Sequence, residues 1–130
     1  MRSTIAFGFM IILLAFSACK KAPGPGGKAK IRGKVYVKNY NSNFTSILSE
    51  YYLQGENVFI TYGNESIVGD NVKTSYDGSY EFPYLRPGTY KVFAISKDPH
   101  GNSADISVIQ EVSITGKKQV VELPDIVVYN

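Results

Sequence analysis

The chain has 130 residues, enough for one domain, and its aromatic residues are ten tyrosines and seven phenylalanines, with no tryptophan. Its formal net charge is +3, yet six of its fourteen basic residues lie between Lys20 and Lys34, where there is no acidic residue. Because the remainder, from Val35 on, has seven basic and eleven acidic residues, the charge distribution argues against a nucleic-acid-binding domain, whose basic residues would cover one face.

Residues 1–18 have the composition of a secretory signal peptide. Arg2 precedes fourteen uncharged residues, Ile5 to Ala18, which as a helix are too short for a bilayer core of about 30 Å. A basic residue before a short apolar stretch that ends in small residues is typical of an export signal. We therefore expect export, with residues 1–18 removed.

The single cysteine, Cys19, follows this stretch directly. Ser17-Ala18-Cys19 resembles the lipobox of bacterial lipoproteins, in which the cysteine is lipidated and becomes the new N-terminus, although Phe16 stands where that motif usually has leucine. The alternatives are cleavage by the ordinary peptidase, which leaves a free exported thiol, and a buried structural cysteine. A lone cysteine cannot form an intramolecular disulfide. The resemblance implies lipidation of Cys19, which would hold the protein stably at a membrane.

Residues 19–29 predict a flexible tether between this anchor and a folded domain. Lys20 to Lys28 is rich in proline and glycine, which support neither a helix interior nor a central strand. The Cys-Lys-Lys opening resembles lipoproteins of the Bacteroidetes group, in which an acidic run after the cysteine is associated with display on the cell surface. No acidic residue occurs here before Glu50. The resemblance therefore implies a cell-envelope lipoprotein of the outer membrane that faces the periplasm.

Residues 30–130 predict a domain made of short strands. From Lys30 to Lys38, apolar residues and glycine alternate with charged residues and a tyrosine, as in a strand with one buried face. Turns are predicted at Asp77-Gly78, Arg86-Pro87-Gly88 and Thr115–Lys118. Further strands are predicted at Asn57–Tyr62, Asn71–Tyr76, Ser79–Phe82, Thr89–Lys97, Asp105–Ile114 and Gln119–Val128. About seven strands with regular turns favour an all-β sandwich.

One segment has a helical period instead. Its apolar residues recur at intervals of three and four, with Gly55 at the position of a C-terminal stop and Asn43 or Thr45 as a possible cap; they are Phe44, Ile47, Leu48, Tyr51 and Tyr52. We expect a short amphipathic helix near residues 45–53, inserted between the first two strands.

The strand and turn residues together resemble a known family. Ile31-Arg-Gly-Lys-Val-Tyr-Val, Gly55-Glu-Asn-Val-Phe-Ile, Thr74-Ser-Tyr-Asp-Gly-Ser-Tyr-Glu-Phe and Leu85-Arg-Pro-Gly-Thr-Tyr-Lys-Val are similar to the carboxypeptidase-regulatory-like domain. The resemblance runs from about Lys30 to the C-terminus and implies a seven-stranded Greek-key β-sandwich of the prealbumin (transthyretin-like) type. Modules of that family are usually non-catalytic accessory domains. The helical insertion departs from the compact form of the family.

No catalytic set, cofactor motif or metal-ligand pattern stands out in the sequence. His100 is the single histidine and lies in a loop context, and no nucleophile motif or phosphate-binding glycine loop occurs. Candidate calcium ligands are Asp70, Asp77 and Glu81. Calcium needs six to eight oxygen ligands, however, and the turn alone explains Asp77. Lys–Asn isopeptide bonds of the related collagen-adhesin B-type domains use an acidic residue at the position that Ala94 occupies here.

These observations favour a non-enzymatic, membrane-anchored module of the cell envelope that binds another protein. We expect the partner to dock at a patch formed by Tyr40, Tyr51 and Tyr52, because tyrosine buries a large ring at an interface and keeps a polar tip. The structural alternative is that the predicted helix only covers an open end of the core. The functional alternative is binding of a polysaccharide through exposed tyrosines, which the absence of tryptophan weakens.

Overall fold

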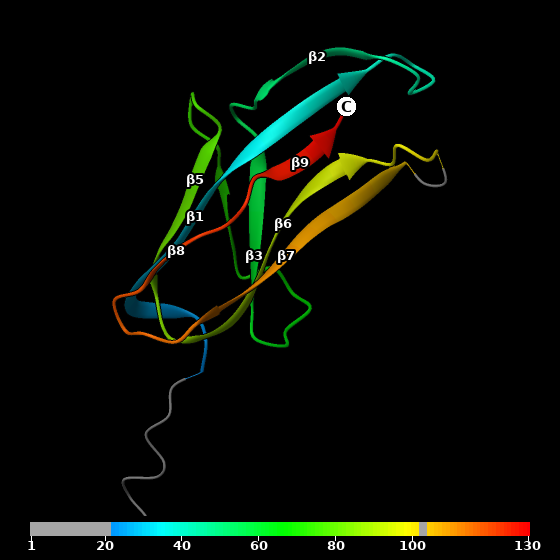
Figure 1. The fold of residues 1–130 in the computed structure, drawn as a ribbon. Helices are drawn as coiled ribbons and strands as arrows, with labels where there is room; N and C mark the ends of the chain where they lie inside the picture. Colours follow the sequence, from blue (N-terminus) through cyan, green and yellow to red (C-terminus); the bar gives the residue numbers. More distant parts are fainter. Residues whose placement is uncertain (1–21, 102–103) are drawn as a thin grey trace, which may run out of the picture.

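The computed structural model describes residues 22–101 and 104–130, which form two β-sheets packed face to face (Figure 1). The signal peptide and Cys19 lie outside these described residues. None of the described residues belongs to a helix that could cross a bilayer. The regular elements of the described residues are all strands, which confirms the predicted all-β class.

The first sheet is built around one long strand, β1 (Pro25–Tyr40). Two strands pair with it in antiparallel fashion, β2 (Ile47–Tyr52) and β5 (Ser79–Leu85). Two more run parallel to it, β8 (Val120–Glu122) and β9 (Ile126–Tyr129). Ile31 pairs with both Phe82 and Val121, so β5 and β8 lie on opposite sides of β1. Figure 1 shows β2 and β9 along the second half of β1.

The second sheet is antiparallel throughout, in the order β4-β3-β6-β7. Its strands are β3 (Asn57–Tyr62), β4 (Asp70–Lys73), β6 (Gly88–Lys97) and β7 (Asp105–Ile114). The longest pairing joins β6 to β7 over ten residues on each strand, from Gly88 opposite Ile114 to Lys97 opposite Asp105.

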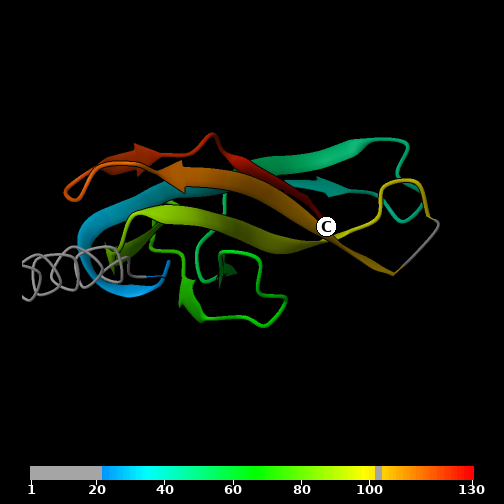
Figure 2. The same ribbon diagram turned by 90° about the horizontal axis from the view of Figure 1, so that it is seen from below.

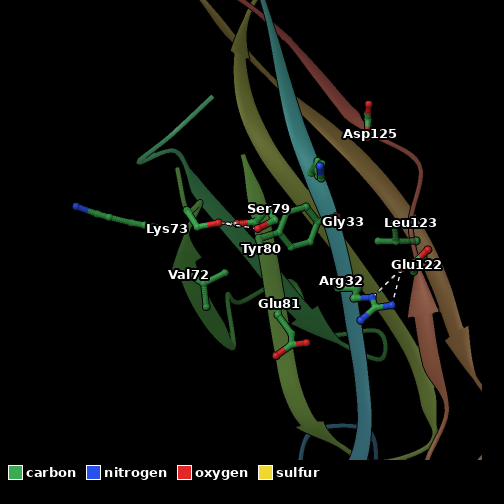
Figure 3. Close-up of a pocket in the computed structure, with 12 residues that line it drawn as sticks. Arg32, Gly33, Val72, Lys73, Ser79, Tyr80, Glu81, Glu122, Leu123 and Asp125 are labelled. Carbon is green, nitrogen blue, oxygen red and sulfur yellow. Dashed lines mark hydrogen bonds and ion pairs between the residues drawn. The ribbon is translucent and has the colours of Figure 1, made fainter. Parts of the chain in front are cut away.

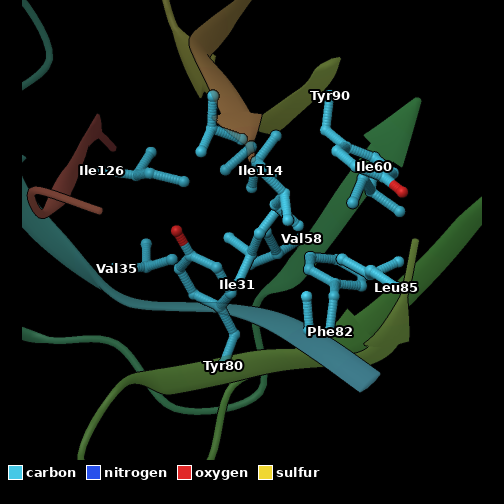
Figure 4. Packing of buried hydrophobic residues seen from close by; sticks show 14 of the residues in the cluster. Ile31, Val35, Val58, Ile60, Tyr80, Phe82, Leu85, Tyr90, Ile114 and Ile126 are labelled. Atoms are coloured by element: carbon cyan, nitrogen blue, oxygen red, sulfur yellow. The ribbon is translucent and has the colours of Figure 1, made fainter. Parts of the chain in front are cut away.

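The core lies between the two sheets and follows the alternation of each strand (Figure 4). The largest fully buried side chains come from both layers: Ile31, Val35, Val37, Phe82 and Ile126 from the first sheet, and Val58, Ile60, Tyr90 and Val92 from the second. Burying each such side chain contributes about 1.5–3 kcal/mol relative to exposing it. Tyr80, Phe82 and Tyr90 are thus core residues, as their strand positions predict.

The described residues contain nine strands rather than the predicted seven. One difference lies near the C-terminus, where the single strand predicted over Gln119–Val128 is divided into β8 and β9. The break comes at Pro124, which has no backbone N–H to give to a ladder.

The second difference is the helix predicted near residues 45–53, which is wrong. Ile47–Tyr52 is strand β2, paired with β1 through a turn at residues 41–46. Asn41 holds this turn, because its Oδ1 accepts hydrogen bonds from the backbone N–H groups of Thr45 at 2.8 Å and Ser46 at 3.1 Å. A helix of nine residues has little stability of its own, whereas the edge of β1 offers backbone hydrogen bonds to a segment with aromatic and β-branched residues.

The third difference concerns the tether predicted over residues 19–29. Strand β1 begins at Pro25, and Ala29 is fully buried. A Cβ at Gly27 would lie 2.1 Å from the carbonyl oxygen of Leu85. Glycine here permits close packing of β1 on β5 rather than chain flexibility.

Candidate binding surface

The outward face of the first sheet carries a group of tyrosines. Tyr36 and Tyr40 alternate with lysines on β1, opposite the core-facing valines. The ring of Tyr36 meets that of Tyr52 on β2 edge to face, with centroids 5.1 Å apart. The ring of Tyr40 lies 5.8 Å from that of Tyr129 on β9. We call these four residues, Tyr36, Tyr40, Tyr52 and Tyr129, the tyrosine face.

Tyr52 is held in place by charged groups on both sides. Its hydroxyl donates a hydrogen bond of 2.8 Å to Oδ2 of Asp125, which lies between β8 and β9. The Nζ of Lys34 stands 4.9 Å from the centre of its ring, within cation–π range. The hydrogen bond to Asp125, and then the charge of that carboxylate, raise the pKa of Tyr52. The hydroxyl of Tyr52 is therefore a neutral hydrogen-bond donor. The side chain is held by Lys34 on β1 and by Asp125 just before β9.

A groove of about 720 Å³ adjoins the tyrosine face and is lined from β1, β4, β5, β8 and the chain after β8 (Figure 3). Lys34 and Asp125, which contact Tyr52, also line this groove. Most of its other charges are paired. Arg32 contacts Oε1 of Glu122 through Nε at 2.8 Å and Nη2 at 2.6 Å, and Glu81 meets Lys30 at 3.4 Å.

Tyr80 lies beneath this groove, across the backbone of Gly33. Its hydroxyl oxygen is buried and has no hydrogen-bond partner among residues 22–101 and 104–130. In Figure 4 this hydroxyl points toward Val35 and Ile126. Burial, and secondarily the negative charge of Asp125, raise the pKa of Tyr80 far above its ordinary value. Burial therefore favours the neutral form of the phenol.

Strand β2 is an open edge of the first sheet. All six of its side chains are exposed, including Leu48 at 71% and Tyr51 at 49%, and Glu50 is its one charged residue. The N–H of Leu53 donates to the carbonyl of Val35, so by alternation the backbone groups of Glu50 and Tyr52 face away from β1. No other strand of the described chain pairs with them.

The three tyrosines predicted to form one docking patch lie in different environments. Tyr52 pairs with Tyr36 and points outward, whereas Tyr51 pairs with the core residue Val37 and lies on the opposite face of the sheet. Tyr40 is only partly exposed and packs against Phe44 and Tyr129. The predicted lipidation site, Cys19, is outside the described residues.

Sequence reasoning missed Asp125 and Tyr129 as neighbours of these tyrosines. Tyr52 and Asp125 are 73 positions apart in the chain, and only the parallel pairing of β9 with β1 brings them together. The alternation of lysine and tyrosine along β1 did signal the outward direction of Tyr36.

The other residues weighed for chemistry are dispersed. Asp77 accepts hydrogen bonds from Ser79 and Ser75, which lower its pKa from 3.8 to about 2, while Glu81 pairs with Lys30. In the part of the chain that the structure describes, no three His, Cys, Asp or Glu residues gather as metal ligands. His100 is exposed in its loop, and Ala94 is fully buried on β6.

Comparison with known proteins gives a likeness in structure but none in sequence. No protein-family model matches the sequence. No curated protein matches it either. Among solved structures, a Pseudomonas aeruginosa protein described as a "putative carbohydrate binding protein" aligns with 88% of this chain and 94% of its own, at 12% identity and a TM-score of 0.45.

Proposed function

We propose that the chain is a lipid-anchored, non-enzymatic binding module of the cell envelope, with Cys19 as the lipidated residue and a prealbumin-like Greek-key sandwich as the binding domain. Three sequence features support the anchor: the basic start, the short apolar stretch and the single cysteine after Ser17-Ala18. Replacing Cys19 with serine should move the protein from the membrane fraction to the soluble periplasmic fraction. A Cys19→Ser protein that stays in the membrane after signal cleavage would refute the anchor.

We further propose that the partner is a protein that adds an extended segment to β2. The observation that carries this proposal is the state of β2: an edge strand with apolar side chains exposed on both faces and one charge. Natural proteins protect such edges with lysine, proline, bulges or covering loops, because free N–H and C=O groups recruit other strands. Strand β2 has one such irregularity, a register shift at Leu48, but its backbone groups at Glu50 and Tyr52 face away from β1 and pair with no other described strand. A partner's strand that pairs with these groups would also contact the exposed side chains of Leu48 and Tyr52.

A proline substitution tests strand addition directly. Glu50→Pro removes a backbone N–H that faces away from β1, so it should leave the melting temperature nearly unchanged and abolish binding. Glu50→Gln is the matched control, because it removes the same charge and keeps the N–H. A photo-crosslinking amino acid at position 48 in living cells reports the contact. The proposal fails if both variants crosslink equally well, and a loss in both would assign the contact to the charge instead.

A glycan is the second candidate, favoured by the groove beside the tyrosine face. Aromatic rings stack on sugar rings, and the paired Arg32 and Glu122 present donors and acceptors suited to hydroxyl groups. If a polysaccharide binds there, Arg32→Ala and Tyr36→Ala should each reduce retention on a polysaccharide affinity gel, whereas Glu50→Pro should not. Unchanged retention of both alanine variants would remove this candidate.

A further inference from the structure

Four segments meet at the end of the sandwich where the described chain begins. They are residues 22–28, 63–69, 84–88 and 115–119, which we call the entry end. A Cβ at Gly63 would lie 3.6 Å from the ring of Pro23, and one at Gly88 would clash with the same ring, 2.8 Å from its Cβ. The N–H of Lys30 donates to the carbonyl of Gln119 at 3.0 Å. Figure 2 shows the start of β1 and the turn after β7 at this same end.

Residues 22–24 are fixed to this end by hydrogen bonds. The N–H of Gly24 donates to the hydroxyl of Tyr90 at 2.9 Å, and the carbonyl of Gly24 accepts from the N–H of Arg86 at 2.9 Å. The Arg86 side chain donates to the carbonyl of Ala22 at 3.3 Å. Only Lys20 and Lys21 therefore separate Cys19 from the folded domain. Three residue steps span at most about 11 Å, so acyl chains on Cys19 would lie close to the entry end.

The charge of the entry end differs from that of the rest of the domain. Its four segments contain one acidic residue, Glu65, and four basic ones, Lys28, Arg86, Lys117 and Lys118. Asp70 follows at the start of β4. All other described residues together have seven basic and ten acidic side chains. Basic residues at the base of a membrane-anchored domain are attracted to anionic headgroups, by about fivefold in affinity for each residue.

The same end also exposes apolar side chains. Tyr84, next to the Leu85 carbonyl that packs on Gly27, is 71% exposed, and Ile67 in the loop after Gly63 is 77% exposed. Val68 beside it is 43% exposed. Single exposed apolar residues are ordinary on soluble proteins. Apolar and aromatic residues among lysines, beside an acyl anchor, match the composition of surfaces that enter the headgroup layer of a bilayer.

We propose that the entry end is a membrane-binding surface that lies against anionic lipid headgroups, with Tyr84 and Ile67 in the interfacial layer. The proposal rests on the lipid anchor at Cys19, which brings this end to the bilayer. After its bend, strand β1 leads away from the entry end from Ala29 to Tyr40, eleven residue steps or about 36 Å. The tyrosine face and the edge of β2 are thereby presented away from the membrane, in one orientation rather than on a loose tether.

The test uses the full chain, processed in cells, purified in detergent and reconstituted into vesicles of phosphatidylcholine with or without phosphatidylglycerol. A second cysteine, Ser66→Cys at the entry end or Asn43→Cys at the far end, carries a fluorophore, and a headgroup-attached quencher reports its distance from the lipid. Cys19 takes no label when it is acylated. Two labels per chain together with failure to float with vesicles would therefore disprove the anchor separately from the surface.

We expect strong quenching at position 66, increased by phosphatidylglycerol, and little at position 43. Lys117→Glu with Lys118→Glu should reduce the quenching at position 66 severalfold in anionic vesicles. Lys38→Glu with Lys97→Glu is the matched control, with the same change of net charge on strands that lead to the far end, and should have no effect. Equal quenching at positions 66 and 43 would overturn the proposal, as would equal effects of the two lysine pairs.

Discussion

The phenol of Tyr80 lies so close over Gly33 that a Cβ at position 33 would stand 2.5 Å from the Tyr80 hydroxyl oxygen and 2.9 Å from its Cζ. Gly33 and Tyr80 are paired across β1 and β5, and both face the core side of the sheet. The missing side chain of one residue thus makes the space for the ring of the other. This contact also sets the floor of the groove beside the tyrosine face.

Gly33→Ala should destabilise the domain by about 1–3 kcal/mol, because the tyrosine ring is held by the surrounding core and cannot move freely away from an added methyl group. Urea unfolding measures the change. Gly116→Ala is the control, since the nearest atom to a Cβ there is 3.5 Å away and the residue has no positive φ angle. Equal stabilities of the two variants would show that Tyr80 can leave its position without cost.

The same close contacts explain which parts of the fold the sequence could predict. Alternating strands and glycine turns are local signals, and they located most of the strands and turns. Gly27, however, looks the same in a sequence whether glycine serves flexibility or close packing. Its role depends on the Leu85 carbonyl, which lies more than fifty positions away. The tether was therefore predicted to be longer than the structure allows.

The wrong helix prediction and the missed contact between Tyr52 and Asp125 have related causes. The spacing of Ile47, Leu48, Tyr51 and Tyr52 fits one face of a helix, but six residues are too few to separate that period from an edge strand. Pairing with β1 then decided the conformation. The contact of Tyr52 with Asp125 needs the order of strands around β1, which no local pattern contains.

Acid should destabilise the domain through Asp77. Hydrogen bonds from Ser79 and Ser75 to the carboxylate lower the pKa of Asp77 in the folded state to about 2, from 3.8. Because the folded state holds this proton less tightly, the contribution to stability is complete above about pH 4 and is lost as the pH falls toward 2. Asp77→Asn should flatten the loss of stability over that interval in urea unfolding. A carboxyl NMR titration of Asp77 with a midpoint near 4 would contradict the prediction.

Residues 22–27 should stabilise the domain although they precede the predicted domain start. A protein that begins at Lys28 should still fold, because the core residues from Ala29 on are retained, but it should melt at a lower temperature than one that begins at Ala22. The shorter chain loses the hydrogen bonds between Gly24 and both Tyr90 and Arg86. Each such bond contributes about 0.5–1.5 kcal/mol, and the buried Tyr90 hydroxyl would also lose a partner.

Tyr90→Phe separates the two contributions. In the chain that begins at Ala22 this change should cost stability, because the backbone N–H of Gly24 loses its acceptor. In the chain that begins at Lys28 it should cost less, because only the hydrogen bond from the Tyr90 hydroxyl to the carbonyl of Arg86 is lost there. If the cost is the same in both chains, residues 22–24 do not use the Tyr90 hydroxyl, and the short attachment to the anchor would be in doubt as well.

Glutamate substitutions at two exposed positions of β2 should differ in their effect on stability. Tyr52→Glu should lower the melting temperature by several degrees. It removes the edge-to-face contact with Tyr36 and the hydrogen bond to Asp125, and it places a second carboxylate beside Asp125, which Lys34 offsets only in part. Leu48→Glu should leave the melting temperature nearly unchanged, because Leu48 is 71% exposed.

This contrast decides which variant can report on a partner at β2. A lost interaction in Tyr52→Glu would be ambiguous, since a weakened sheet edge and a blocked contact give the same result. Leu48→Glu changes the surface without removing a contact that holds the strand. If Tyr52→Glu melts like the unaltered protein in a thermal scan, the Tyr52–Asp125 hydrogen bond contributes nothing to stability. The ring of Tyr52 would then be free to turn toward a ligand.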